Sequence, residues 1–207
     1  RAYVKDPGQN ETSANIRFIL KKKKFRSDKV NLSDNFLQQK MPDFQTAVPE
    51  LRGKPLVDVF IYVNTKVRTD NFTTIQALCK KSQPKALWEG TFLRMKDGSP
   101  MALYGDRRQW VFDNKEIGES LHEGIDLAST EKAPVQAANN GIILYAGSLG
   151  IYGNAVIIDH GLGMISLYGH LSSIQVKEGQ AVKLGDVIGN TGMSGLAGGD
   201  HLHFGIM

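Results

Sequence analysis

The sequence predicts a mainly β protein, in which an antiparallel β-sheet domain follows a smaller domain of mixed α+β or β type. Short apolar runs separated by glycine turns recur from Ala133 onward without a helical period. The composition also changes near residue 119. Residues 1–119 hold 22 Lys and Arg against 14 Asp and Glu, a net charge of +8, whereas residues 120–207 hold 3 against 7, a net charge of −4. All five histidines and 16 of the 22 glycines lie in residues 120–207, so we expect the chemistry there.

The expected elements follow from local patterns along the chain. In the first region, β-rich runs predict strands at 14–20, 55–63, 87–95 and 102–112. Asp70 or Asn71 could cap a helix that runs to about Lys81 and ends before Pro84. The turn residues Gly98-Ser99-Pro100 give the best boundary, which predicts an accessory domain at 1–99 and a second domain at 100–207. In the second domain we expect strands at 142–146, 155–159, 164–168, 181–183 and 201–206.

Composition excludes several classes of protein. The single cysteine, Cys79, rules out an intrachain disulfide framework and a cysteine-based zinc finger. The most apolar stretch, 57–63, is far shorter than the roughly 20 residues of a membrane span. The chain begins at Arg1 without a basic and apolar leader, so we expect any export signal or anchor to be removed or left out. We interpret Lys21–Lys24 as a solvated strand edge and expect no nucleic-acid partner.

Two histidine patterns predict a metal site. In His201-Leu202-His203 the two imidazoles lie at i and i+2, which places them on one face of a strand. His122 and Asp126 lie four residues apart, a spacing that aligns them on a strand or a helix, and Gly118 and Gly124 favour extended chain. If the two segments are neighbours, His122, Asp126 and one histidine of the pair form a His₂Asp site with an open position, the composition of a catalytic zinc centre.

A zinc ion would activate water and polarise a carbonyl, so no serine or cysteine nucleophile is needed. The histidine of the pair that does not bind metal and His170 suit proton transfer and oxyanion stabilisation. We interpret His160 as a structural residue that caps a turn.

Four sequence blocks stand in one order in the C-terminal half: His122-x-x-x-Asp126, Gly153-Asn154-x-Val156-Ile157-Ile158-x-His160-Gly161, Leu167-Tyr168-Gly169-His170-Leu171, and Gly199-Asp200-His201-Leu202-His203-Phe204. Their order and spacing resemble those of the lysostaphin/LytM-type zinc metallopeptidases of bacterial cell walls, over about residues 100–207. Residues 60–126 are similar to the N-terminal extension of Gram-negative members.

The resemblance implies a duplicated-hybrid-motif fold with one zinc ion per chain, bound by His122, Asp126 and His203. It implies His170 and His201 as the catalytic pair near the attacking water and the oxyanion. It further implies a zinc metalloendopeptidase that cuts peptidoglycan cross-links and works outside the cytoplasm, in the periplasm or cell envelope. A tyrosine found shortly before the first ligand in some relatives is missing here, and its role has no evident holder.

Several alternatives stay open. The chain could be a non-catalytic regulator of cell-wall hydrolases, although every ligand position is filled. A histidine phosphocarrier is less favoured, because phosphotransfer needs no carboxylate ligand.

Arg107 or Arg108 could bind a substrate carboxylate or pair with a local aspartate. The glycine-rich loop 192–199 could shape a substrate groove or be a flexible turn. We expect the basic N-terminal domain to contact the envelope or to cover the cleft.

Overall fold

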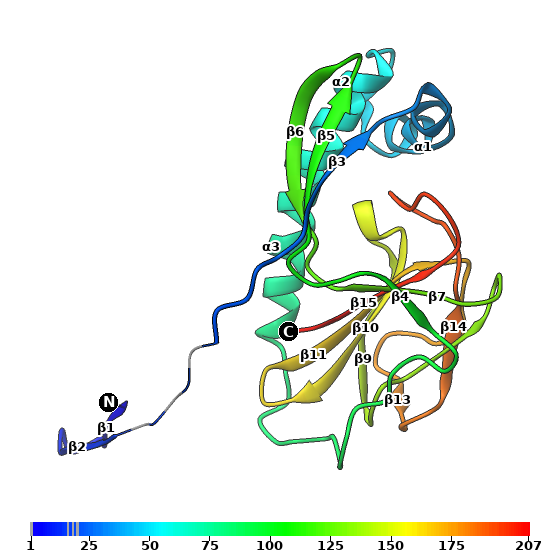
Figure 1. Ribbon diagram of the computed structural model, residues 1–207. Coiled ribbons are helices and arrows are strands. Elements are labelled where there is room, and N and C mark those ends of the chain that lie inside the picture. Colours follow the sequence, from blue (N-terminus) through cyan, green and yellow to red (C-terminus); the bar gives the residue numbers. More distant parts are fainter. Residues whose placement is uncertain (1, 16, 18, 20) are drawn as a thin grey trace.

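The computed structural model describes every residue except 1, 16, 18 and 20, and it is mainly β with antiparallel sheets and an α+β N-terminal region, as predicted (Figure 1). Its centre is a seven-stranded sheet in the spatial order β13, β9, β10, β11, β15, β7, β4, in which all neighbours are antiparallel. The strands are β4 (Ser99–Ala102), β7 (Ile125–Ala128), β9 (Gly141–Ser148), β10 (Asn154–Gly161), β11 (Met164–Leu171), β13 (Ala181–Val182) and β15 (Leu202–Ile206).

One face of this sheet packs against a three-stranded sheet. That sheet has the order β12, β14, β8 and consists of β8 (Pro134–Gln136), β12 (Ser173–Ile174) and β14 (Val187–Asn190). Val156 and Ile158 of β10 join its buried core, whereas Ile157 between them joins the core on the opposite face. Successive side chains of a strand alternate between faces, so a central strand covered on both sides is apolar throughout.

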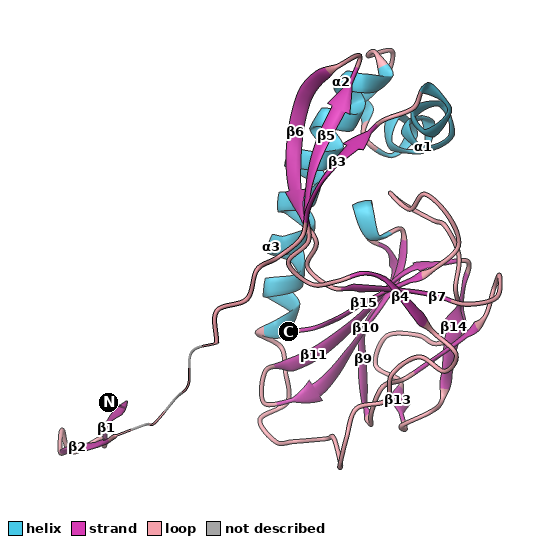
Figure 2. Cartoon of the chain, in the orientation of Figure 1, coloured by secondary structure: helices cyan, strands magenta, loops and turns pink. Residues whose placement is uncertain are grey.

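The N-terminal region covers the other face of the central sheet. A small sheet holds β3 (Ser27–Asn31), β5 (Arg107–Phe112) and β6 (Lys115–Leu121), with β3 parallel to β5 and β5 antiparallel to β6. The helical elements are α1 (Asp34–Ala47), η1 (Pro49–Leu51), α2 (Leu56–Tyr62), the π-helical turn η2 (Val63–Val67) and α3 (Arg68–Cys79). Figure 2 shows α3 running alongside the central sheet, while the other helices pack near the small sheet. Buried residues of these helices share one core with Ile157, Ile165 and Leu167 of β10 and β11.

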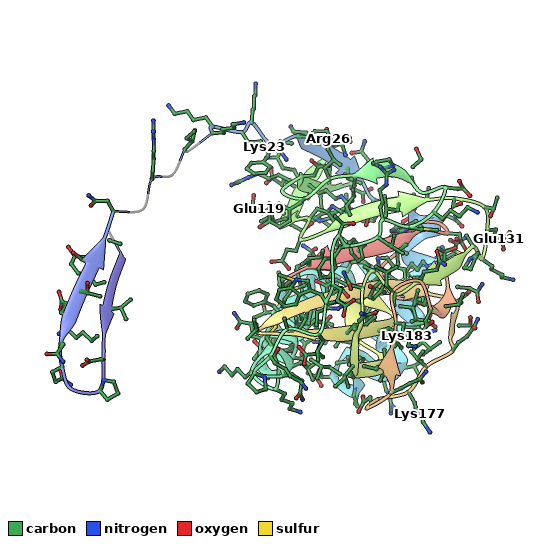
Figure 3. All side chains as sticks on the ribbon, turned by 90° about the horizontal axis from the view of Figure 1, so that it is seen from below. Lys23, Arg26, Glu119, Glu131, Lys177 and Lys183 are labelled. Carbon is green, nitrogen blue, oxygen red and sulfur yellow. The ribbon has the colours of Figure 1, made fainter. Side chains whose placement is uncertain are left out.

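The first residues stand apart from this body. Strands β1 (Ala2–Lys5) and β2 (Glu11–Ala14) form a hairpin whose described side chains are exposed and which lies away from Lys23 and Arg26 (Figure 3). The predicted strand 14–20 lies partly outside the described residues, at 16, 18 and 20. Lys21–Lys24 are exposed and belong to no strand, so they are solvated but do not form a strand edge. Within the described residues, no helix is long and apolar enough to cross a bilayer.

The predicted strand at 55–63 is wrong, because this segment forms α2. Its β-branched residues favour a strand locally, but a helix gathers Val59, Phe60 and Val63 on one face. All three side chains are fully buried in the core shared with the sheet, which outweighs the local preference.

Two further strand predictions need correction. Residues 87–95 form no strand, since their backbone bonds to the sheet are isolated contacts such as Leu87 N–H to the His160 carbonyl (2.7 Å). The predicted strand 102–112 is two strands, β4 and β5, in different sheets. They are separated by a turn in which Gly105 has a φ of 86° and the Asp106 carboxylate accepts from Leu103 N–H at 2.9 Å.

The remaining predictions of elements agree with the structure. The runs at 142–146, 155–159, 164–168, 181–183 and 201–206 coincide with β9, β10, β11, β13 and β15. The helix predicted up to about Lys81 is α3, but it has no cap at Asp70 or Asn71 because it continues from α2 through η2. The division of the chain at residues 99 and 100 stays a prediction; the chain passes from the central sheet to the small sheet between β4 and β5.

Candidate metal centre

Pairing between β7 and β15 brings the predicted metal ligands together. Asp126 of β7 lies directly opposite His203 of β15, and His122 lies in the extended segment between β6 and β7. The Asp126 Oδ1 atom is 2.9 Å from His122 Nε2 and 3.0 Å from His203 Nδ1, and those two nitrogens are 3.1 Å apart. All three side chains are buried, and their ligand atoms lie within 4.8 Å of one another.

The chemistry of these three donors fits a zinc ion. His122 Nδ1 lies 2.9 Å from the Leu103 carbonyl, which can only accept, so this nitrogen carries the proton and Nε2 offers a lone pair to the cluster. Two imidazole nitrogens and a carboxylate oxygen thus converge at hydrogen-bond distance, an arrangement that needs a proton or a cation between them. In His203 the nitrogen that faces the cluster is Nδ1. Its other nitrogen, Nε2, is buried and has no hydrogen-bond partner among the described residues.

Burial and hydrogen bonding set the protonation states needed for metal binding. Burial opposes ionisation of Asp126, but its contacts with the imidazoles of His122, His201 and His203 outweigh this effect and hold the Asp126 pKa well below its ordinary value. Burial lowers the pKa of His203, and the nearby carboxylate only partly offsets this effect. An ionised carboxylate and a neutral imidazole are the forms that bind a divalent cation.

The predicted catalytic pair lies beside these ligands. The rings of His170, in β11, and His201, just before β15, have centroids 4.8 Å apart, and His201 Nε2 is 3.6 Å from Asp126 Oδ1. His170 Nδ1 lies 2.9 Å from the Ser194 carbonyl and His201 Nδ1 lies 2.8 Å from the Gly199 carbonyl. Because a carbonyl only accepts, each Nδ1 carries a proton, and in the neutral form of each ring Nε2 keeps a lone pair. His170 also has a φ of 65°, a strained backbone conformation typical of functional sites.

The glycine-rich loop 192–199 has a role that neither of its two predicted functions, a substrate groove or a flexible turn, included. Its carbonyls orient both histidines, and the loop is held in place by the rest of the protein. The buried Lys40 ammonium of α1 donates to the Met193 carbonyl, and Leu196 packs against the helical core. Leu196 N–H also donates to the Ile151 carbonyl at 2.9 Å.

A cavity of about 400 Å³ opens beside the ligands and is lined from both regions of the chain. Arg108 reaches it, with its Nη2 atom 3.3 Å from Asp126 Oδ2, so the local ion pair is the alternative seen here. Sequence patterns missed Arg68 and Tyr152, which also line the cavity. The Tyr152 ring lies 5.3 Å from the His203 ring, and its own signal, Tyr152-Gly153-Asn154, is only a turn pattern.

His160 does not belong to the site. It is fully buried at the end of β10, where its Nδ1 lies 2.7 Å from the Asn140 carbonyl and its Nε2 lies 2.7 Å from Ser166 Oγ. These bonds join neighbouring parts of the sheet, so His160 is structural, although it bridges strands and does not cap a turn.

Comparisons with known proteins agree with this geometry. The model of peptidase family M23 matches residues 120–207. The DD-carboxypeptidase/endopeptidase Mpg of Neisseria meningitidis is 46% identical over 84 residues, which are 41% of this chain and 19% of that protein. The peptidoglycan DD-endopeptidase ShyA of Vibrio cholerae is 39% identical over 83 residues, 40% of this chain and 19% of that protein. The matched stretch is thus about a fifth of the length of each of these relatives.

A solved structure extends the match to the fold. The crystal structure of a zinc-containing peptidase from Vibrio cholerae superposes with a TM-score of 0.50 at 27% identity, covering 60% of this chain and 37% of that one. Together with the family model and the grouping of His122, Asp126 and His203, this likeness identifies residues 120–207 as a peptidase family M23 domain of the lysostaphin/LytM type.

Proposed function

We propose that this protein is a zinc metalloendopeptidase that hydrolyses peptide bonds in the cross-links of bacterial peptidoglycan. The observation that carries the proposal is the convergence of His122, Asp126 and His203 at one end of a cavity that His170 and His201 also line. The relatives named as endopeptidases, one of them a peptidoglycan DD-endopeptidase, support the substrate class. A peptidoglycan substrate implies a place in the cell envelope.

His122 Nε2, Asp126 Oδ1 and His203 Nδ1 would hold the metal. When bound, zinc would polarise the scissile carbonyl and lower the pKa of a bound water. His170 and His201 handle protons: each donates Nδ1–H to a loop carbonyl and so presents Nε2 as an acceptor. The nitrogen that takes a proton from the attacking water then becomes a donor for the oxyanion or for the departing amine.

Arg108 holds the Asp126 carboxylate from the side opposite the histidines. Its guanidinium contacts Oδ2, while Oδ1 faces His122 and His203, so each oxygen has its own partner. This contact fixes the orientation of the carboxylate and favours its ionised form.

The test is mass spectrometry of products after incubation with intact peptidoglycan, with and without a zinc chelator. We expect chelator-sensitive release of uncrosslinked peptides. The His170→Asn variant should bind zinc normally but release no peptides, and Glu131→Gln, an exposed change away from the ligands, should match the wild type. A zinc-loaded protein that releases nothing would refute the proposal and favour the non-catalytic regulator.

A further inference from the structure

Three arginines from the N-terminal region line the cavity, and they differ in their partners. Arg26 Nη2 is 3.0 Å from Asp106 Oδ2, and Arg108 Nη2 is 3.3 Å from Asp126 Oδ2. Arg68 has no carboxylate oxygen within 4.0 Å among the residues that the structure describes. A half-buried guanidinium beside a cavity, with no carboxylate in direct contact, can bind an anionic ligand.

The structure holds the Arg68 guanidinium in a fixed position. Its Nε and Nη2 atoms donate to the Asn64 carbonyl at 3.3 Å and to Asn64 Oδ1 at 3.1 Å. Asn64 is buried and is fixed in turn by β6, because its Nδ2 donates to the Glu119 carbonyl at 3.0 Å. Both residues belong to the region of the π-helical turn η2, a distortion often found at functional sites. Neutral oxygens thus occupy two of the five N–H groups, and the others are available to a ligand.

The surroundings of Arg68 connect it to the metal centre. Burial lowers the pKa of the Arg68 guanidinium, and the charges of Tyr152 and Glu123 act in the opposite direction. Tyr152 also stacks at an angle beside His203, with a distance of 5.3 Å between ring centroids. Arg68, Tyr152 and the predicted ligand His203 therefore all line the same cavity.

We propose that Arg68 binds a free carboxylate on the peptide substrate, close to the scissile bond. This inference rests on the proposed peptidase function and adds a specificity-determining residue supplied by the N-terminal region. A carboxylate matches the fork of a guanidinium and forms charge-assisted hydrogen bonds that a carboxamide cannot form. We therefore expect native substrate to be cleaved about 10- to 100-fold more efficiently than substrate whose carboxylates are amidated.

The first test compares native peptidoglycan with peptidoglycan amidated by a carbodiimide and ammonia. The readout is the ratio of the two initial rates of peptide release by the zinc-loaded full chain. Arg68→Gln should bring this ratio close to one, Arg68→Lys should restore part of it, and Arg26→Gln should keep it, since Arg26 is already paired with Asp106. Thermal melting checks that each variant is folded. An unchanged ratio in a folded Arg68→Gln protein, or equal rates in the wild type, would overturn the inference and leave the peptidase function intact.

The second test does not depend on hydrolysis. The zinc-free full chain, in which no metal competes for a carboxylate, is titrated with N-acetyl-dialanine or with its C-terminal amide, and the Arg68 Nε–H resonance is followed by NMR. We expect a saturable shift with the carboxylate and little with the amide; the Arg68→Gln protein, which lacks this resonance, serves to assign it. If no peptidoglycan is cleaved at all, the proposed function fails and this titration alone decides: an Arg68 resonance that does not respond to the carboxylate overturns the inference.

Discussion

The contact between Asn71 of α3 and Ile151 of the cavity wall allows a prediction about stability. Asn71 is buried, and its Oδ1 atom accepts from the Ile151 backbone N–H at 2.9 Å. Asn71→Ala would leave this buried N–H without its partner, at a cost of about 1–3 kcal/mol. For a domain of this size each kcal/mol lowers the melting temperature by about 2–4 °C, so we expect a decrease of about 2–12 °C.

Urea unfolding and thermal melting, both followed by circular dichroism, measure the Asn71→Ala effect. Thr74→Ala is the matched control, because Thr74 is exposed on the same helix and its loss should change the free energy of unfolding by less than about 0.5 kcal/mol. If Asn71→Ala is as stable as the control, the contact between α3 and the cavity wall contributes no stability and our reasoning about this contact is wrong.

Two further predictions concern the metal and pH. Zinc at about 100 times its dissociation constant should stabilise the wild type by about 2.7 kcal/mol and raise its melting temperature by about 5–11 °C; an equal shift in Asp126→Ala would contradict the ligand assignment. Burial lowers the pKa of His160 below the ordinary 6.5, so its contribution to stability is complete above pH 6.5 and is lost as the pH falls below it. Urea titrations at about pH 7.5 and 5.0 should therefore show a smaller acid-induced loss of stability in His160→Gln than in the wild type, and equal losses would contradict this assignment.

The grouping of His122, Asp126 and one histidine of the 201/203 pair was predictable because its geometry is mostly local, whereas the choice of His203 came from the family resemblance. His122 and Asp126 lie four residues apart, and His203 needs only the pairing of two strands to reach them. The tautomers of the histidines were not predictable, since they depend on carbonyls of residues 103, 194 and 199 that only the folded chain brings near.

Long-range packing explains most of what sequence patterns missed. The helix α1 has a cap at Ser33 and buries Leu37, Met41 and Phe44 on one face, a pattern visible in the sequence but not assigned there. For α2, strand propensity and helical burial conflict, and only the presence of a sheet face to cover decides between them. Arg68 belongs to the segment that is similar to the N-terminal extension of Gram-negative members, but its place at the cavity was not predictable, because the cavity is shared with residues more than 50 positions away.

The contact between α1 and the glycine-rich loop determines which part of the chain must be transferred to another protein to keep the candidate site intact. Lys40 holds the Met193 carbonyl, and the loop from 192 to 199 in turn aims His170 and His201. A graft limited to the family-matched segment 120–207 would carry His122, Asp126, His170, His201 and His203. It would lack Lys40, which holds the loop that orients His170 and His201. The smallest unit that keeps this arrangement of side chains is therefore larger than the segment by which the family is identified, and it includes the first helix.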